Sequence, residues 1–373
     1  MAKFTKYVFA VHAWLGLVAG AFILVMSLTG AALVFSKELD RALNQEQHLT
    51  AAPAPGQAPL TWDVLYGRAR RYAATRGYTV GAFRDLPAQP TETIEVLLVR
   101  GEEYTSVYLN PYSGQVLGPQ PRPLTRWLLE LHYTFFLGKV GEALAALFAL
   151  ALVGSVLTGL VVYRKHLVPV LLFQQKISWR NWRTAASGLH RVLGVWTWLF
   201  NLVLAVSGVW FLLYLLEPAS WQAAPPAAAA QPVTISLDAV VRQVRRQLPG
   251  ARLTYLNFPR TAADTTGQFY LDLPGRCWLG EWATTVTYSA RTGRLLSTAL
   301  EADLPLSTQV SNALGVLHFG QYGGLAVKLL YCAGGLLTAA ISLTGFALWW
   351  RRHRPVVRRR QSATGPQPTP QPV

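Results

Sequence analysis

The chain has 373 residues, of which 51% are hydrophobic and 14% charged, with 34 Lys and Arg against 18 Asp and Glu and only two cysteines. This composition excludes an intrinsically disordered chain and a disulfide-framed domain. The apolar residues gather into four runs free of Asp, Glu, Lys and Arg, each reaching the roughly 20 residues that a membrane helix needs.

These runs alternate with two polar stretches, each rich in strand and turn residues and too large to be a simple connection. Each stretch begins with an amphipathic segment and continues into hairpin-like sequence, which is typical of a small α+β domain. The predicted order is a first transmembrane helix at 1–36, a polar domain at 37–126, an outer helix with the second transmembrane helix at 127–163, a loop at 164–191, the third transmembrane helix at 192–216, a linker and second polar domain at 217–309, an outer helix with the fourth transmembrane helix at 310–350, and a basic tail at 351–373.

Basic residues orient this four-helix bundle. The N-terminal tail, the loop at 164–191 and the tail after the fourth helix together hold 14 Lys and Arg and no acid. By the positive-inside rule these segments face the cytoplasm, so we expect a multi-pass protein of the bacterial inner membrane with both termini cytoplasmic and both polar domains periplasmic. The positive charge thus reflects topology and contact with the lipid bilayer, and we expect no nucleic-acid partner.

The sequence also indicates an internal duplication, because matching residues recur at constant offsets. A first set shares one offset and consists of His12 with His190, Gly16 with Gly194 and Gly30 with Gly208. A second set shares a slightly larger offset and consists of His132 with His318, Gly138 with Gly324 and Thr158-Gly159 with Thr344-Gly345. The predicted unit is helix, domain, helix, made twice.

Four of the seven histidines occupy these repeated positions, and they are the candidate site residues. From their depth in the spans we pair His12 with His190 towards the cytoplasm and His132 with His318 on the outer side. A zinc or copper site needs three or four converging ligands, and each pair offers only two histidines. A proton relay needs acids within the spans, and the spans contain no Asp or Glu. Two facing imidazoles on separate helices suit a six-coordinate b-type haem, and no motif for covalent haem attachment occurs.

Other residues near these histidines leave alternatives open. Gly16 and Gly194 each lie one helical turn after a histidine, where they either leave room for a flat macrocycle or let two helices pack closely. Lys139 and Lys328 follow the outer histidines, where they either pair with haem propionates or reach the membrane interface. Because His132 lies well before the apolar core of its span, with Lys139 in between, we expect the outer site at or above the periplasmic interface.

Several short motifs resemble those of the PepSY-associated transmembrane helix family. They are His12-Ala-Trp-Leu-Gly-Leu, Ser27-Leu-Thr-Gly30, Leu131-His132, Leu189-His190-Arg, Leu317-His318-Phe-Gly and Ser342-Leu-Thr-Gly345. Within the family, the four-span layout with two PepSY-like domains looks most like the FoxB-type ferric-siderophore reductases, which are related to the PiuB iron-uptake proteins.

That resemblance implies an oxidoreductase with two haems b, in which His12, His132, His190 and His318 are the axial ligands of the haem iron. It also implies that a ferric siderophore is reduced in the periplasm and releases Fe(II). No nucleotide-binding motif is present, so the electrons would come from membrane quinol or a separate cytoplasmic reductase. Two other classes stay open: a non-enzymatic membrane protein whose PepSY-like domains bind a periplasmic partner, and a haem or metal transporter.

Overall fold

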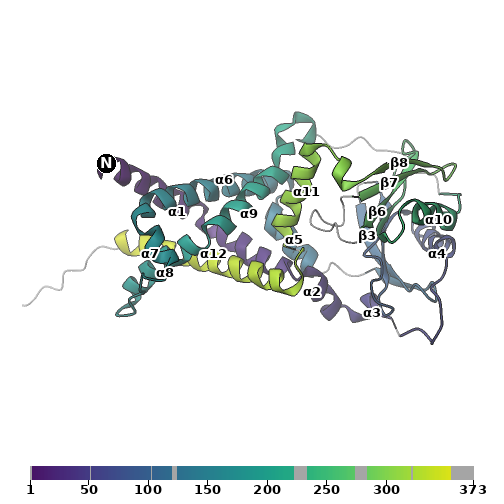
Figure 1. The fold of residues 1–373 in the computed structure, drawn as a ribbon, viewed down its shortest axis with the longest axis horizontal. Coiled ribbons are helices and arrows are strands. Elements are labelled where there is room, and N and C mark those ends of the chain that lie inside the picture. Colours follow the sequence, from purple (N-terminus) through teal and green to yellow (C-terminus); the bar gives the residue numbers. More distant parts are fainter. Residues whose placement is uncertain are drawn as a thin grey trace, which may run out of the picture.

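The computed structural model describes residues 2–50, 52–101, 103–119, 124–221, 233–273, 284–320 and 322–353. They form a helical bundle that carries a β-sheet at one end (Figure 1). We call that end the sheet side and the opposite end, where the N-terminus lies, the far side. Most of the predicted linker after the third span, and the basic tail beyond residue 353, lie outside the described residues.

Three helices are long and apolar enough to cross a membrane: α1 (Ala2–Leu33), α6 (Gly138–Tyr163) and α12 (Gly324–His353). Helix α1 packs against both α6 and α12. The third predicted span differs from the straight helix expected at 192–216. It is a pair of helices, α8 (Trp182–Trp196) and α9 (Trp198–Phe211), bent by 65° at Thr197, and it begins inside the segment predicted as the loop at 164–191.

Side-chain hydrogen bonds surround this bend. The hydroxyl of Thr197 donates to the carbonyl oxygen of Leu193 at 2.8 Å, and Nδ2 of Asn201 donates to Oγ1 of Thr197 at 3.0 Å. From α12, Oγ1 of Thr338 donates to Oδ1 of Asn201 at 2.6 Å. Buried polar groups are tolerated in an apolar bundle when they bond one another, so this network stabilises a break that hydropathy alone does not reveal.

The rest of the predicted loop at 164–191 is also partly helical. A 3-10 turn η1 (Arg164–His166) and a short α7 (Leu167–Leu171) follow α6. Helix α8 then begins with a capping box, in which the side chain of Asn181 accepts from the backbone N–H of Thr184 at 3.0 Å. These elements close the far side of the bundle (Figure 1).

Two shorter helices, α5 (Leu124–Thr134) and α11 (Leu306–Phe319), lie at the sheet side, where α11 runs across the long axis of the bundle (Figure 1). Helix α5 ends at Thr134, and Phe135 and Phe136 then take positive φ before α6 begins. The chain therefore turns back, and α5 packs against α1. His132 therefore lies on a separate helix, and not on a straight continuation of the second span as the sequence suggested.

The two polar stretches form one sheet, which corrects the expectation of two separate domains. The eight antiparallel strands run in the order β4-β3-β2-β1-β5-β6-β7-β8, symmetric about the central β1–β5 pair. The first four strands are β1 (Thr79–Arg84), β2 (Ile94–Arg100), β3 (Glu103–Leu109) and β4 (Val116–Pro119). The second four are β5 (Arg252–Asn257), β6 (Thr266–Asp272), β7 (Thr284–Ser289) and β8 (Leu295–Ala299). Pairing β1 with β5 removes one exposed edge from each half.

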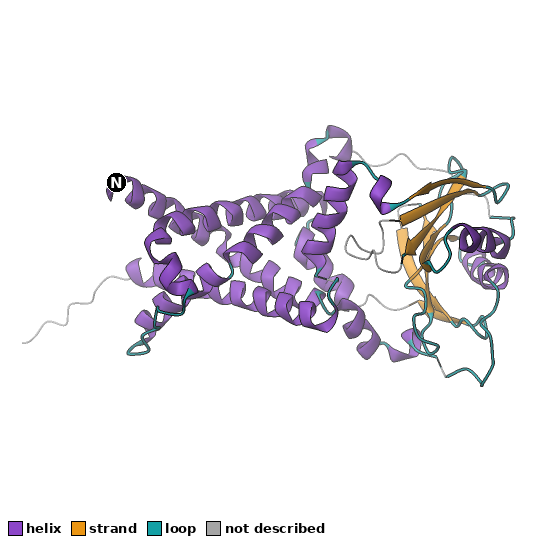
Figure 2. Cartoon of the chain, viewed as in Figure 1, coloured by secondary structure: helices purple, strands orange, loops and turns teal. Residues whose placement is uncertain are grey.

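Helices α4 (Trp62–Ala74) and α10 (Leu237–Gln247) cover the face of the sheet that points away from the bundle (Figure 2). Their buried residues and those of the strands form one core that includes Leu65, Phe83, Leu237 and Phe269. Each helix is capped by the other: Asp63 accepts from the backbone N–H of Leu237, and Asp238 accepts from that of Trp62. The halves of the sheet domain are therefore joined by strand pairing, packing and capping.

Short helices complete the connections. Helices α2 (Ser36–Leu43) and α3 (Gln45–His48) lead from α1 to the sheet domain. The 3-10 turns η2 (Leu213–Leu216) and η3 (Pro218–Trp221) follow α9, and η4 (Glu301–Asp303) precedes α11. Helix α2 contacts both parts of the molecule, because Lys37 and Arg41 pair with Asp85 of the sheet domain while Asp40 accepts from Oγ1 of Thr125 on α5.

Candidate metal or cofactor site

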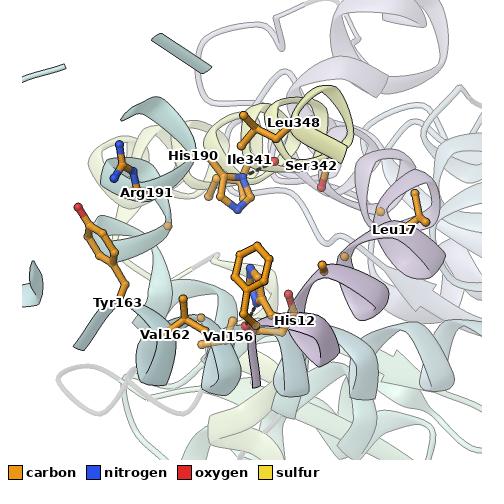
Figure 3. Close-up of a pocket in the computed structure, with 18 of the residues that line it drawn as sticks. His12, Leu17, Val156, Val162, Tyr163, His190, Arg191, Ile341, Ser342 and Leu348 are labelled. Carbon is orange, nitrogen blue, oxygen red and sulfur yellow. Dashed lines mark hydrogen bonds between the residues drawn. The ribbon is translucent and has the colours of Figure 1, made fainter. Parts of the chain in front are cut away.

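The four repeated histidines lie in two facing pairs. On the far side, His12 of α1 faces His190 of α8, with ring centroids 6.2 Å apart and ring planes at 71° (Figure 3). On the sheet side, His132 of α5 faces His318 of α11, with centroids 6.4 Å apart and planes at 69°. We call these the far-side pair and the sheet-side pair. The structure thus brings together the two pairs that depth in the sequence predicted.

Hydrogen bonds from neighbouring helices hold both rings of the far-side pair. Nδ1 of His12 lies 3.0 Å from the carbonyl oxygen of Ser155, and Nδ1 of His190 lies 3.1 Å from that of Ile341. The hydroxyls of Thr158 and Thr344 lie beside the same nitrogens at 3.2 and 3.3 Å. A carbonyl oxygen can only accept, so Nδ1 carries the proton in both rings and Nε2 keeps its lone pair.

On the sheet side, hydroxyl groups lead to the same assignment. Oγ1 of Thr29 donates its proton to the carbonyl oxygen of Val25 at 2.7 Å, and it lies 2.9 Å from Nδ1 of His132. Oγ of Ser207 likewise donates within α9 and lies 2.8 Å from Nδ1 of His318. Since each hydroxyl has only one proton, it accepts from the histidine. All four rings therefore keep a lone pair on Nε2, which a metal ion could accept, and each is held by a hydrogen bond at Nδ1.

A glycine follows each of these four hydroxyl residues and gives the imidazole room. A Cβ built on Gly30, Gly159 or Gly345 would lie 3.1 Å from Cε1 of His132, His12 or His190, respectively. At Gly208 the corresponding distance to His318 is 3.6 Å. The sequence signal is the repeated Thr-Gly dipeptide, which marks the duplication and the family motifs. Its role in seating the histidines requires contacts between helices, and Ser207-Gly208 escapes the pattern because serine replaces threonine.

A cavity of about 530 Å³ surrounds the far-side pair. Its walls come from α1, α6, α8, α9 and α12, and the labelled lining residues enclose an open space between the two imidazoles (Figure 3). Gly16, Gly20 and Gly194 face open space, because a Cβ on any of them would meet no atom within 4 Å. Apolar pockets of roughly 300–1,000 Å³ with a few polar groups are typical of cofactor sites.

Lysines near the sheet-side pair already have acidic partners. Lys139 lies 3.3 Å from Glu142 and donates to the hydroxyl of Tyr214 at 2.7 Å, while Lys328 pairs with Glu38. To the two alternatives expected for these lysines, the structure thus adds a third, an ion pair within the protein.

Each histidine pair supplies two ligands and no more. In the part of the chain that the structure describes, no group of three or more His, Cys, Asp or Glu side chains gathers into a metal-binding cluster. An ion held at either pair would therefore need its remaining ligands from another molecule.

The apolar helices define this chain as a helical membrane protein that contains two facing histidine pairs. It belongs to the PepSY-associated TM region family, whose model matches residues 9–352. This confirms the family resemblance in the motifs. A relative, the uncharacterized protein PA4219 of Pseudomonas aeruginosa, is 27% identical over 258 residues, which cover 62% of this chain and 64% of that protein. The match thus spans less than two thirds of the relative's length.

Proposed function

We propose that the protein is a membrane oxidoreductase that holds one haem b at each histidine pair. The separation of the imidazoles carries this proposal. If each Nε2 lies about 2 Å from a central iron and about 1.1 Å from its own ring centroid, the two centroids lie roughly 6.2 Å apart. The observed separations are 6.2 and 6.4 Å, which match the separation expected for two imidazoles that share one ion.

The surroundings of the far-side pair fit the same cofactor. The cavity is broad, mainly apolar and open beside Gly16 and Gly194, as a flat macrocycle requires. When bound, haem b supplies reversible one-electron chemistry at iron. The protein's own groups keep each ligand in place: the Nδ1 hydrogen bonds fix the tautomer and ring orientation, and the apolar walls exclude water.

The spacing of the two pairs supports transfer of electrons across the membrane. The far-side pair includes His12, and the sheet-side pair contacts Thr29 on the same helix, which places them about 25 Å apart along α1. The hydrocarbon core of a bilayer is about 30 Å thick. One pair therefore lies near each face of the membrane.

We infer that the sheet side is periplasmic and that both termini are cytoplasmic in the bacterial inner membrane, because the basic residues without acids lie on the far side. On this orientation, a haem held by His12 and His190 would take electrons from quinol or a cytoplasmic reductase, and one held by His132 and His318 would supply them to an acceptor in the periplasm. The resemblance to FoxB-type proteins suggests a ferric siderophore as the acceptor. Reduction to Fe(II) weakens binding by hard oxygen ligands and releases iron for uptake.

We also infer that the chain arose by duplication, since both sites are built from residues that recur at constant offsets in the sequence.

Optical spectra of the detergent-purified protein, oxidised and dithionite-reduced, test the haem assignment together with a pyridine haemochrome count. We expect two haems b per chain and the loss of one in His12→Ala or His190→Ala and of the other in His132→Ala or His318→Ala. His166→Ala is the matched control, because His166 is exposed in η1 and belongs to neither pair.

A second measurement tests the reaction. Dithionite-reduced protein mixed with a ferric hydroxamate siderophore should be reoxidised, with Fe(II) trapped by ferrozine. A protein without haem after expression with ample haem would contradict the reductase proposal and favour a partner-binding PepSY protein. Haem that exchanges across a proteoliposome membrane without supporting iron reduction would favour a transporter.

A further inference from the structure

Two arginines line the cavity of the far-side pair. Arg191 follows His190 on α8, and Arg352 lies in the last turn of α12. Arg191 and Tyr163 lie on the opposite side of the cavity from Leu17, which is deeper along α1 (Figure 3). One end of an otherwise apolar cavity is therefore cationic.

These guanidinium groups have no acidic partner among the described residues, and the sequence explains why. Segments 1–37, 143–216 and 304–373 contain no Asp or Glu. Arg191 uses Nε to donate to the carbonyl oxygen of Ser187 at 3.0 Å and lies over the ring of Tyr163 at 5.8 Å. Arg352 lies over the ring of Phe9 at 4.9 Å. Guanidinium has five N–H donors in a planar fork, so both side chains keep donors for a carboxylate or phosphate.

The sheet side differs in this respect. There the corresponding cations, Lys139 and Lys328, are neutralised by Glu142 and Glu38. The two cavity arginines on the far side are exposed and have no acidic partner among the described residues, so they keep donors free for an oxyanion from outside the protein. A carboxylate of a cofactor and a phosphate of a lipid headgroup share that chemistry.

We propose that Arg191 and Arg352 bind the two propionate carboxylates of the haem at the far-side pair; this inference rests on the proposed function. Haem is an apolar disc with both carboxylates on one edge, which matches a cavity with apolar walls and two cations at one end. Other basic residues of the far side, such as Arg183, do not line the cavity. The arginines thereby fix the orientation of the macrocycle about the axis through His12 and His190.

The test compares Arg191→Gln and Arg352→Gln with Arg183→Gln, which removes an exposed arginine from the same helix α8. Each purified holoprotein is mixed with excess apomyoglobin, and the rate of haem loss is followed optically. Haem loss from the two sites should give two kinetic phases. The His132→Ala variant, which keeps only the far-side haem, shows which phase belongs to that haem. The same measurement is made after reconstitution with haem dimethyl ester, in which both carboxylates are blocked, and in nanodiscs of phosphatidylcholine with or without phosphatidylglycerol.

We expect each cavity variant to release the far-side haem at least about tenfold faster, the size of one charge-assisted hydrogen bond, and Arg183→Gln to match the wild type. With the dimethyl ester this difference should vanish. An equal difference with the ester, or one seen only with phosphatidylglycerol, would assign the arginines to lipid phosphate and overturn the inference. If neither variant changes the rate of haem release, the inference about the arginines is wrong but the proposed function stands. If the protein binds no haem, the proposed function is wrong as well.

Discussion

Thr29 and His132 lie 103 positions apart in the chain, yet Oγ1 of Thr29 lies 2.9 Å from Nδ1 of His132. The hydroxyl passes its own proton to Val25 and therefore accepts from the ring. The same arrangement joins Thr158 to His12, Thr344 to His190 and Ser207 to His318. In each pair, one helix carries the histidine and another orients its ring.

Replacing the acceptor at the sheet-side pair should weaken that site alone. Thr29→Val keeps the shape of the side chain but removes the oxygen that holds Nδ1–H of His132. We expect a roughly 10- to 100-fold loss of affinity for the sheet-side haem, as is usual for such outer partners, and a higher midpoint potential because the imidazole becomes a poorer donor. Haem titration and spectroelectrochemistry measure both effects. Thr29→Ser, which keeps the hydroxyl, should resemble the wild type; equal effects of the two substitutions would contradict this role.

Adding one methyl group beside a far-side histidine should displace its ring. A Cβ on Gly159 would lie 3.1 Å from Cε1 of His12. Ser155 and Thr158 of the same helix hold Nδ1 of this ring, so a methyl group between them and the ring would push it away and move Nε2 off the axis of the pair. We expect Gly159→Ala to lose about half of the bound haem while the chain still folds. Gly67→Ala, in α4 with open space around it, is the control and should keep both haems. Full haem content in Gly159→Ala would show that the site tolerates the shift.

Reciprocal capping should couple the halves of the sheet domain. Asp63→Ala removes acceptors from the start of α10, and Asp238→Ala removes them from the start of α4. Loss of an N-cap costs about 1 kcal/mol. Hydrogen-exchange mass spectrometry of the intact protein should therefore show faster exchange in α10 for Asp63→Ala and in α4 for Asp238→Ala. Faster exchange only in the helix that carries the substitution would argue against reciprocal capping.

The same contact makes the sheet domain sensitive to acid. Burial by itself raises the pKa of Asp238, but the backbone N–H groups of Asp63 and Trp62 outweigh it and hold the pKa below its ordinary value of 3.8. Because the pKa of Asp238 is lower in the folded state, its carboxylate stabilises the domain at pH values above the ordinary pKa. This stabilisation is lost as the pH falls through the pKa of the folded state. Exchange in α4, divided by the intrinsic rate at each pH, should thus increase below about pH 4. In Asp238→Asn, which does not titrate, the additional acid sensitivity should be absent.

The buried side chains of Asn201 and Thr338, at the bend of the third span, should stabilise the protein mainly through the hydrogen bond between them. Thr338→Val leaves Oδ1 of Asn201 without the donor it has at 2.6 Å. An unsatisfied buried acceptor costs about 1–3 kcal/mol, so thermal unfolding in detergent should occur at a lower temperature. The double variant Asn201→Leu with Thr338→Val removes both partners and should be less destabilised than the sum of the single variants. Additive losses would show that the two side chains act independently.

Much of the architecture could be predicted because it depends on local patterns. Runs without charge identify three spans, and alternating strand residues with turn glycines identify the sheet strands. The bend at Thr197 was missed because α8 and α9 are apolar on both sides of the break, and it is stabilised by Thr338 from another helix. The single sheet was missed because the pairing of β1 with β5, which sets Phe83 opposite Leu256, joins segments far apart in the chain, and periodicity carries no information about such pairs.

For the candidate site, the sequence alone determined which residues to examine: the constant offsets select His12, His132, His190 and His318, and their depth predicted the pairs that face each other in the structure. Only the tertiary structure decided how they are arranged. Ring separations, the proton on Nδ1, the glycine beside each ring and the cationic end of the far-side cavity all depend on contacts between helices. Local sequence encodes the hydrophobicity and period of one element, whereas the direction of a side chain is set by packing against residues far away in the chain.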